Sequence, residues 1–356
     1  MNSILNEERK KDLRSTYVQA PKFGLVLGAG VTANSGVPTY DELALRLLER
    51  ASHEKGFSGS PGWVRTFVQN QRELLAKKDR KTVPPDEVVL FTRAHLGADE
   101  KLLRKLTKQV LYKNVAARRT VGRDAFRNNT TLDAILTFCA ARPDTVIAPA
   151  SKYEIEVNDR IGGILTTNYD NLLEGAFHTK YRRNLLKPVG RPGAREFIRG
   201  RRLIPVYHIH GYVGYREPVD LDNLPRTSDV VIAEDDYFEI FYDPLGFGNY
   251  IAMSFFRRFP CLFIGSGLGD KNLRRFLFHL TKDIGETATH QRKFAILKSS
   301  ETVDDEFTDK ILLSYGIETI WISKYDEIEG ILQNLYTSVG GVKRTDWDFV
   351  AGYRWG

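Results

Sequence analysis

Four segments of the sequence place glycine or polar side chains directly after short apolar runs that are typical of buried strands. They are Gly28–Gly30 (GAG), Thr166–Asp170 (TTNYD), His208–Gly211 (HIHG) and Gly265–Asp270 (GSGLGD). Glycines let backbone N–H groups approach phosphate oxygens closely, and a helix that begins just after them favours negative charge. A histidine at the end of a strand can exchange protons near neutral pH. The four segments together indicate a site that binds a phosphorylated ligand and moves a proton.

The elements that would bring these segments together are parallel strands. Short apolar runs alternate with segments of helical spacing, a pattern that predicts a parallel sheet covered by helices on both faces. Ligands of such sheets bind in the crevice beyond the carboxyl ends of the strands, so the four segments would converge on one crevice. The predicted fold class is α/β, a Rossmann-like doubly wound parallel sheet with a helical insert.

The predicted elements follow the spacing of apolar residues. Strands are expected at residues 23–27, in the strand–loop unit 163–170, and at 204–209, 261–264, 293–297 and 319–322. Helices are expected at residues 41–50, 63–77, 99–113, 131–141, 171–177, 249–259, 272–282, 304–315 and 325–335, and residues 234–236 are expected to be an acidic helix start. The stretches PPDE and RNNTT and the basic region 180–202 are predicted to be loops.

Changes in composition along the chain predict its division into three parts. Residues 1–20 form a polar leading segment with at most one short helix, and residues 21–339 form the main domain. The helical insert of that domain covers residues 51–145, a region rich in helix formers. Residues 340–356 form an aromatic tail that holds two of the four tryptophans, so we expect it to dock on the body of the protein or on another subunit.

Each of the four segments also has a purely structural interpretation. A tight turn between strand and helix accounts for the glycines, and Asp170, Asp270 or Asn272 could cap a helix. Alternatively, Asp270 and Asn272 could bind ribose hydroxyls, and Ser266 could donate to a phosphate or ribose oxygen. Capping explains Asp170 but leaves Asn168 unexplained. The acidic residue that dehydrogenases carry about 20 residues after the first glycine loop is not clear here, which disfavours that class.

The amino-acid composition further limits the class of protein to which this chain can belong. Of the 356 residues, 42% are hydrophobic and 27% are charged, as expected of a globular protein with a sizeable core. Cys139 and Cys261 lie in apolar surroundings and are too few for a disulfide framework or a four-cysteine zinc site. The first residues lack the apolar region of a secretory signal, and no run approaches the roughly 18 apolar residues of a membrane span. The sequence therefore predicts a cytoplasmic protein without a membrane segment.

The formal net charge is +7, and basic side chains gather in residues 72–81, 101–119 and 182–202. Solvated helix faces and loops are the simpler interpretation of these stretches. A surface for nucleic acid is the alternative. No zinc-finger spacing and no RNA-binding aromatic motif supports it, so nucleic acid is not expected to be the primary partner.

Taken together, the four segments resemble the motifs of the sirtuin family. GAGVTANSGVP is similar to the sirtuin nucleotide loop G-A-G-x-S-x-x-x-G-I-P, with Thr32 in place of serine and Val37 in place of isoleucine. TTNYD is similar to the family's T-Q-N-x-D segment, His210-Gly211 to its His-Gly pair, and GSGLGD to its G-[TS]-S-L loop. All four occur in the family's order, over roughly residues 22–298.

The resemblance implies that residues 21–339 bind NAD and act on it. It assigns catalytic roles to Asn168 and His210. Contacts with NAD are implied for a larger set that lies in or beside the same four segments. These residues are Gly28, Ala29, Gly30, Thr32, Pro38, Thr39, Tyr40, Asp170, Gly265, Ser266, Gly267, Asp270 and Asn272. No metal ion is expected.

Two departures from the family pattern refine this expectation. Protein-deacylating sirtuins carry a four-cysteine zinc module after the histidine, which this chain cannot supply. Tyr40-Asp41 stands where the family's first loop closes with phenylalanine and arginine. The form TTNYD and the helical insert look more like bacterial sirtuin-like NAD hydrolases, which deplete NAD in antiphage defence and usually work with a partner that senses infection.

The function predicted from the sequence is therefore hydrolysis of the nicotinamide–ribose bond of NAD to give nicotinamide and ADP-ribose. The protein is expected to form a homo-oligomer, to bind a partner protein of the same defence system such as a sensor or an ATPase, or to do both. Two alternatives remain open. One is a regulatory subunit that senses NAD or ADP-ribose without turnover, and the other is an NAD-dependent deacylase or ADP-ribosyltransferase.

Overall fold

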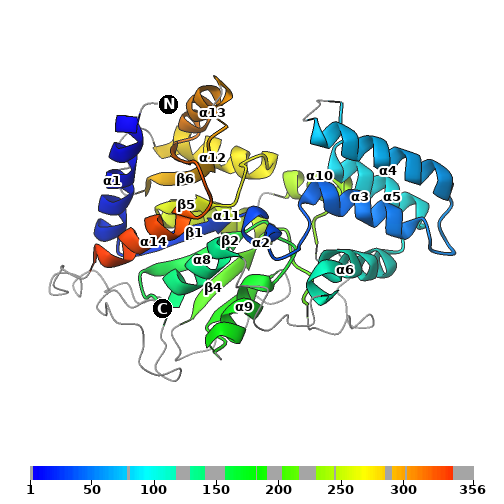
Figure 1. The fold of residues 1–356 in the computed structure, drawn as a ribbon, viewed down its shortest axis with the longest axis horizontal. Coiled ribbons are helices and arrows are strands. Elements are labelled where there is room, and N and C mark those ends of the chain that lie inside the picture. Colours follow the sequence, from blue (N-terminus) through cyan, green and yellow to red (C-terminus); the bar gives the residue numbers. More distant parts are fainter. Residues whose placement is uncertain are drawn as a thin grey trace.

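The structure, a computed structural model, describes residues 3–77, 81–117, 129–140, 157–181, 183–190, 203–215, 230–243, 246–284, 291–300 and 303–339. These residues form one parallel sheet with helices on both faces, and a further group of helices that stands to one side of it (Figure 1).

The sheet has seven strands in the order β3-β4-β2-β1-β5-β6-β7, and every pairing is parallel. The strands are β1 (Phe23–Leu27), β2 (Ile161–Thr166), β3 (Leu186–Val189), β4 (Ile204–His208), β5 (Cys261–Ile264), β6 (Lys293–Lys298) and β7 (Ile317–Ile322). β1 is the central strand, and its last residue, Leu27, pairs with Thr166 of β2 and Ile264 of β5. All residues of β1 and β5 are buried, which accounts for their uninterrupted apolar runs.

Helices cover the two faces of the sheet and bury its apolar side chains. The helices on one face are α1 (Ser3–Gln19), α8 (Thr130–Ala140), α9 (Leu172–Tyr181) and α14 (Glu327–Thr337). Those on the other are α11 (Phe247–Arg258), α12 (Lys271–Ile284) and α13 (Val303–Ser314). Successive side chains of a strand point to opposite faces, so Leu25 and Leu27 join the first cluster and Val26 the second. The predicted Rossmann-like α/β fold is confirmed.

Four more helices pack around an apolar cluster of their own, and we call them the helical unit. They are α3 (Tyr40–Ala51), α4 (Pro61–Ala76), α5 (Pro85–His95) and α6 (Glu100–Ala117). Their cluster also includes Tyr169, Val213 and Ile232, from the segments that follow β2 and β4. The helical unit therefore packs on the chain beyond the carboxyl ends of these strands, to the right of the sheet in Figure 1.

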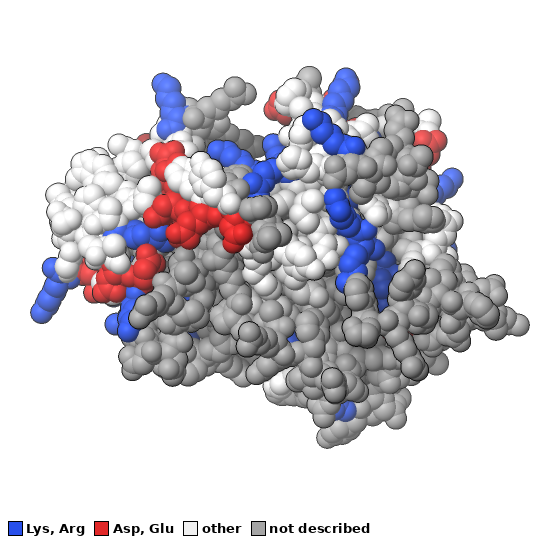
Figure 2. Space-filling view, turned by 180° about the vertical axis from the view of Figure 1, so that it is seen from behind, with Lys and Arg blue, Asp and Glu red and all other residues white. Residues whose placement is uncertain are grey.

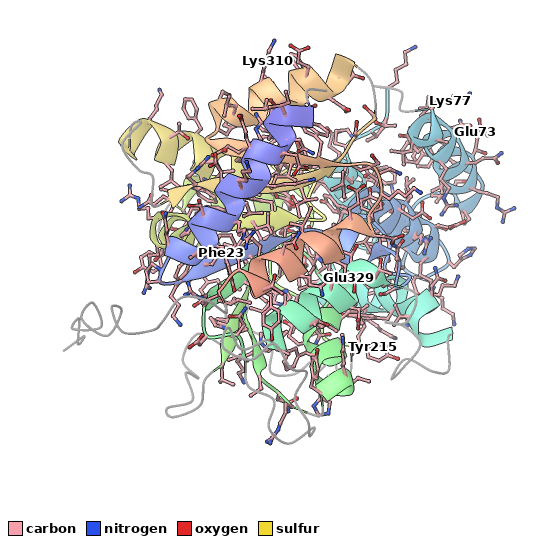
Figure 3. All side chains as sticks on the ribbon, turned by 60° about the vertical axis from the view of Figure 1, so that its left-hand side comes forward. Phe23, Glu73, Lys77, Tyr215, Lys310 and Glu329 are labelled. Atoms are coloured by element: carbon pink, nitrogen blue, oxygen red, sulfur yellow. The ribbon has the colours of Figure 1, made fainter. Side chains whose placement is uncertain are left out.

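The amino-terminal helix α1 belongs to the core beneath the sheet. Leu13 and Tyr17 are almost completely buried, and the ring of Tyr17 lies 5.3 Å from that of Phe23 at the start of β1. Figure 3 shows Phe23 beside the carboxyl end of α1, far from Glu73 and Lys77 on α4 of the helical unit. Residues 3–19 are thus a full helix that contributes to the core, although their sequence is mostly polar.

Two predicted loops contain regular structure. α5 begins inside the stretch PPDE, because proline is favoured in the first turn of a helix and Asp86 and Glu87 complement the helix dipole there. β3 lies within the predicted loop 180–202 and occupies the edge of the sheet, where Pro188 is tolerated. Its four residues are too few to give a periodic signal.

The predicted division of the chain stays a prediction. The tail 340–356 and most of the stretch 118–156 lie outside the described residues. Within the predicted insert 51–145, α4, α5 and α6 belong to the helical unit, whereas α8 packs in the core of the sheet. The helical unit also takes in α3, which precedes the predicted insert.

The glycine loops that follow β1 and β5 are locked together by backbone contact. Gly28 N donates to Ile264 O at 3.0 Å, and Gly30 N donates to Gly265 O at 2.9 Å. A Cβ atom on Gly28 would lie 2.6 Å from Gly265 O, and one on Gly265 would lie 2.6 Å from Val31 N. Gly265 also has a φ of +66°, which side chains rarely adopt. Glycine is therefore required here for the two loops to touch.

Replacing Gly28 with alanine should destabilise the protein by about 1–3 kcal/mol, because the added methyl group overpacks the contact between the two loops. Gly267→Ala is the matched control, since a Cβ atom at that position meets nothing within 4 Å. Urea unfolding of both variants and the parent would measure the difference. Equal stability of the two variants would contradict the interlock.

Candidate functional site

The central strands β1 and β5 mark the point at which the order of strands reverses. After β1 the chain builds β2, β3 and β4 on one side of it, and it then returns to build β5, β6 and β7 on the other. In open parallel sheets, ligands bind beyond the carboxyl ends of the strands at such a switch point. The interlocked loops of Gly28–Gly30 and Gly265–Gly267 lie at this point, as the sequence predicts for a ligand site.

Asp170 is a buried carboxylate that joins the loop after β2 to the first glycine loop. Its Oδ2 accepts a hydrogen bond from Thr32 Oγ1 at 3.0 Å, and its Oδ1 accepts one from Leu172 N at 3.0 Å. Burial raises the pKa of Asp170 above its ordinary value, while these two hydrogen bonds oppose the shift. Asp170 thus caps the start of α9 and holds α2 (Gly30–Ala33), where Thr32 lies.

Asn168 lies in the loop after β2, and its amide contacts the end of the neighbouring strand β1. Its Nδ2 donates to Gly28 O at 3.3 Å, and its backbone N donates to Thr166 Oγ1 at 3.1 Å. Its Oδ1 is buried and has no hydrogen-bond partner among the described residues. A buried amide oxygen without a partner is costly, so Asn168 offers an acceptor to a ligand hydroxyl or a water molecule.

The imidazole ring of His208, the last residue of β4, contacts the backbone of Asn168. Its Nδ1 lies 3.1 Å from Asn168 O, and its Nε2 lies 2.8 Å from Glu174 Oε1 on α9. The ring is almost completely buried, and burial alone would lower its pKa. The Glu174 carboxylate and the contact with Asn168 O outweigh that effect and raise the pKa of His208 above its usual value of 6.5.

His210, two residues further on, has the opposite electrostatic character. Its side chain is 2% exposed, and its Nε2 lies 3.5 Å from Asp270 Oδ2 without a hydrogen bond. Burial lowers the pKa of His210, and the Asp270 carboxylate only partly offsets this shift. His210 is therefore neutral at pH 7 and can accept a proton, and Asp270 can stabilise the resulting imidazolium.

Three tyrosines pack beside His210. The ring of Tyr237 on α10 (Glu234–Tyr242) stands edge-on to the imidazole with 5.4 Å between ring centroids, and the ring of Tyr169 lies 6.5 Å away. The hydroxyls of Tyr40, Tyr169 and Tyr237 are hydrogen-bonded among themselves. Burial raises the pKa of all three hydroxyls, which are neutral donors and acceptors at pH 7.

The loop after β5 contributes further polar groups. Ser266 Oγ accepts from Leu268 N at 3.2 Å and shapes the loop. Asp270 Oδ1 accepts from Leu273 N at 2.8 Å, so this residue caps α12 as well as facing His210. Asn272 Nδ2 donates to Asn249 Oδ1 at 3.3 Å, but Asn272 Oδ1 is buried and has no hydrogen-bond partner in the described part of the chain.

Most of the predicted site residues are joined by direct contacts. Thr32 bonds to Asp170, Asn168 bonds to Gly28, and His210 faces Asp270. Their roles as catalytic or NAD-binding residues stay predictions. The structure does not connect every member of the predicted set: Thr39 begins α3 without a side-chain capping bond, and Pro38 has no recorded polar contact to the others.

Other residues of this region were not singled out from the sequence. Tyr169 stands inside the TTNYD segment and Glu174 lies four residues beyond it, whereas Tyr237 follows an acidic helix start. His208 stands inside HIHG. Tyr169 and His208 belonged to segments already marked as polar strand ends, so proximity to the motif was a usable signal for them. Tyr237 comes beside His210 only through the tertiary fold.

Within the described ranges, no group of three or more His, Cys, Asp and Glu side chains is placed to hold a metal ion. Over the same residues, no helix is both long and apolar enough to cross a membrane.

Comparison with protein families adds an independent observation. Residues 162–320 match the model of the SIR2-like domain. The match runs from β2 to β7 and includes Asn168, Asp170, His210 and the loop after β5, and it covers less than half of the chain. It supports the predicted sirtuin-like character and is compatible with an NAD-related activity. Comparison with curated proteins gave no match.

The raised pKa of His208 predicts a pH-dependent contribution to stability. The folded protein binds this proton more tightly than the unfolded chain, so the contribution is complete below pH 6.5 and is lost as the pH rises through the folded pKa. The free energy of unfolding of the parent relative to His208→Gln should therefore decrease as the pH rises above 6.5. Urea titrations would measure it, with the exposed His279→Gln as control. A difference that grows with pH would contradict the assignment.

Proposed function

We propose that this protein hydrolyses the nicotinamide–ribose bond of NAD. Two buried side chains beyond the carboxyl ends of the neighbouring strands β4 and β2 carry the proposal: a neutral His210, and Asn168, whose Oδ1 lacks a partner within the described residues. Both side chains lie in the part of the chain that matches the SIR2-like domain. Orphaned polar atoms in a buried position are the groups that a polar ligand would satisfy.

The residues present fit NAD as a substrate. The glycine loops after β1 and β5 bring backbone groups together at the switch point, where nucleotide phosphates bind in folds of this kind. A Cβ atom on Gly267 would meet nothing within 4 Å, so the rim of the second loop is open to a ligand. Asn168 Oδ1 and Asn272 Oδ1 supply buried acceptors suited to ribose hydroxyls.

The proposed reaction replaces one bond at the ribose carbon and moves one proton. Nicotinamide is a cationic leaving group that takes the bonding electron pair with it, and an oxocarbenium-like centre develops at the ribose carbon. A water oxygen then bonds to that carbon and gives up a proton. Asn168 can orient the water or a ribose hydroxyl, His210 can take the proton, and the Asp270 carboxylate can stabilise the imidazolium.

Water is the proposed acceptor because the chain lacks the zinc module of protein-deacylating sirtuins and has only two cysteines, both buried. Tyr237 also packs directly against His210, on the segment that follows the histidine strand. A deacylase or ADP-ribosyltransferase would need a second substrate beside this ring. Release of nicotinamide that depends on an acyl-lysine peptide would favour that alternative.

The resemblance of TTNYD and of the predicted helical insert 51–145 to bacterial NAD hydrolases supports a wider role. In this proposal the protein is the NAD-depleting effector of an antiphage defence system and is cytoplasmic. It is held inactive until a second copy or a sensor or ATPase partner releases it. A culture that expresses the protein should lose NAD on phage infection, and a culture that expresses the His210→Ala variant should keep it.

A nucleic-acid function has less support. On the face drawn in Figure 2, the Lys and Arg side chains of the described residues occur in separate groups among acidic and uncharged ones. A binder of nucleic acid relies on a continuous basic surface and loses affinity steeply with salt. Such binding would survive the loss of His210, which separates it from NAD hydrolysis.

Purified protein in its activated state should release nicotinamide from NAD, and the His210→Ala variant should be at least about 100-fold slower because the general base is lost. Asn168→Ala should reduce the rate in the same way. Chromatography of the products measures both, with His279→Ala as a control on an exposed histidine. Tight NAD binding by a parent that releases no nicotinamide would favour the sensor alternative, and equal rates for parent and His210→Ala would overturn the proposed mechanism.

The pH dependence of the reaction should report the pair His210 and Asp270. The proton acceptor must be neutral, so kcat/KM should fall on the acid side with a midpoint below pH 6.5. Asp270→Asn removes the charge that raises the pKa of His210, so the midpoint should move to lower pH while the plateau rate falls. Asp304→Asn, at an exposed position on α13, is the control. A midpoint that moves to higher pH would contradict the pairing.

A further inference from the structure

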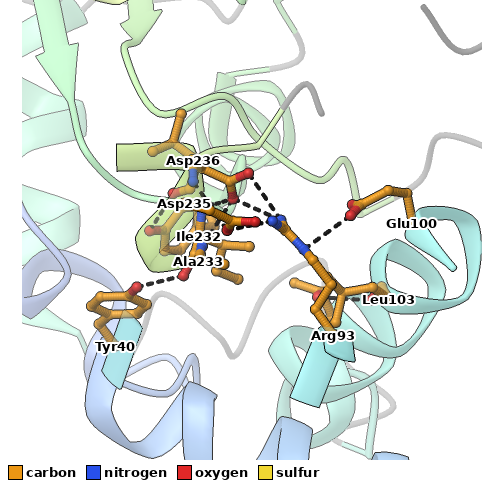
Figure 4. Close-up of polar contacts among 11 residues, drawn as sticks. Tyr40, Arg93, Glu100, Leu103, Ile232, Ala233, Asp235 and Asp236 are labelled. Atoms are coloured by element: carbon orange, nitrogen blue, oxygen red, sulfur yellow. Dashed lines mark hydrogen bonds and ion pairs between the residues drawn. The ribbon is translucent and has the colours of Figure 1, made fainter. Parts of the chain in front are cut away.

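Arg93 of the helical unit reaches out of α5 to the first turn of α10. Its Nη2 donates to both carboxylate oxygens of Asp236, at 2.8 and 2.9 Å, and its Nη1 donates to Asp235 Oδ1 at 2.6 Å. Glu100 Oε1 on α6 lies 2.9 Å from Arg93 Nε. Figure 4 shows the guanidinium at the centre of these three carboxylates, between α5, α6 and α10. One arginine thus joins the helical unit to α10.

The acceptor Asp236 is also the capping residue of α10. Its Oδ2 accepts hydrogen bonds from Ile232 N and Ala233 N, both at 2.9 Å. The side chains of Arg93 and Asp236 are 9% and 7% exposed, so their ion pair is largely removed from water. Removing one partner of such an ion pair would leave the other charge buried and unpaired, which is strongly destabilising. The ion pair therefore holds α10 in a fixed position against α5.

The residue after Asp236 is Tyr237, whose ring stands edge-on to His210. The preceding residues are fixed from the other side: Tyr40 OH donates to Ile232 O at 2.5 Å, and Tyr169 OH donates to Val231 O at 2.8 Å. Val231 N in turn donates to His210 O at 2.9 Å. Contacts therefore run without a break from the guanidinium to the imidazole.

We propose that Arg93 is a positioning residue for His210. Its ion pair with Asp236 holds Tyr237 against the imidazole and thereby links the helical unit to the reactive site. Arg93 touches no reacting atom in this scheme. The inference rests on the proposed function for its effect on rate, but its effect on the surroundings of His210 is independent of any activity.

The groups that face His210 come from four elements. Asp270 of the loop after β5, Tyr169 of the loop after β2 and Tyr237 of α10 face it directly. Tyr40 of α3 acts indirectly, through its hydrogen bond with the tyrosine side chains. Asp270 favours the imidazolium, whereas the rings exclude water and disfavour it. If Tyr237 moves away, water enters, and the pKa of His210 should rise toward 6.5.

The kinetic test compares Arg93→Met with a matched control, Arg72→Met. Arg72 also bridges two carboxylates, Glu42 and Glu49, but it joins α4 to α3 within the helical unit. Arg93→Met should lower kcat roughly 10- to 100-fold with less than about a 3-fold change in KM for NAD, because orientation is lost rather than binding. Arg72→Met should leave kcat unchanged.

Two further variants separate positioning from folding. Arg93→Met with Asp236→Asn removes both charges and leaves no unpaired buried carboxylate at Asp236, so this double variant should fold while still losing kcat. Tyr237→Ala should lower kcat by itself, and adding Arg93→Met to it should cost little more, because the two residues act through one contact. Circular dichroism confirms which variants are folded at the assay temperature.

The activity-independent test is the pKa of His210, measured by NMR on histidine-labelled protein and assigned by the loss of its signal in His210→Gln. Arg93→Met or the double charge-removed variant should raise this pKa, and Arg72→Met should not. An unchanged pKa in the folded variants would overturn the inference, as would full additivity of Arg93→Met and Tyr237→Ala in kcat. A raised pKa in a protein that releases no nicotinamide would leave the inference standing and overturn the proposed hydrolysis alone.

Discussion

The contact between the loops after β1 and β5 is the constraint on which the site depends. These two strands are neighbours at the switch point, and their loops touch through backbone atoms with no room for a side chain at Gly28 or Gly265. That contact fixes where β1 ends, and the carbonyl of Gly28 then holds the Asn168 amide. α2 follows directly, so Thr32 is brought to Asp170. The glycines in these loops are thus required first for the contact between the two chain segments, and only second for the binding of a ligand.

The HIHG segment shows how a fold gives opposite properties to two side chains of one type. Both histidines are buried, but His208 has a carboxylate in hydrogen-bonding contact, and its proton is retained. His210 has its carboxylate 3.5 Å away and aromatic rings around it, and its proton is lost more readily. One histidine can therefore hold the Asn168 loop in place while the other remains free to take a proton. The different roles follow from one hydrogen bond and from the end of β4 at His208, after which the chain turns and brings His210 to face Asp270.

The sequence predicted the sheet, the strand ends and the four polar segments, because strand periodicity and glycine placement are local properties. Contacts that depend on distant parts of the chain were beyond it. Arg93 gave no signal as one basic residue among many, and its partner Asp236 looked like an ordinary acidic helix start. Tyr237 reaches His210 only because α10 is clamped to α5. Local signals also failed where they were ambiguous, as at the PPDE stretch that begins α5 and at the four residues of β3.

The position of β1 in the sheet has a consequence for synthesis of the protein. Leu27, made early, pairs with Thr166 and with Ile264, so the central strand stays unpaired on one side until the ribosome has passed β5. Such a fold has high contact order, and its nascent chain must wait for distant sequence before the sheet closes. Asp270, which faces His210, is translated later still. Translation order thus postpones assembly of the complete site to the last third of the chain, and truncated products of interrupted translation would lack it.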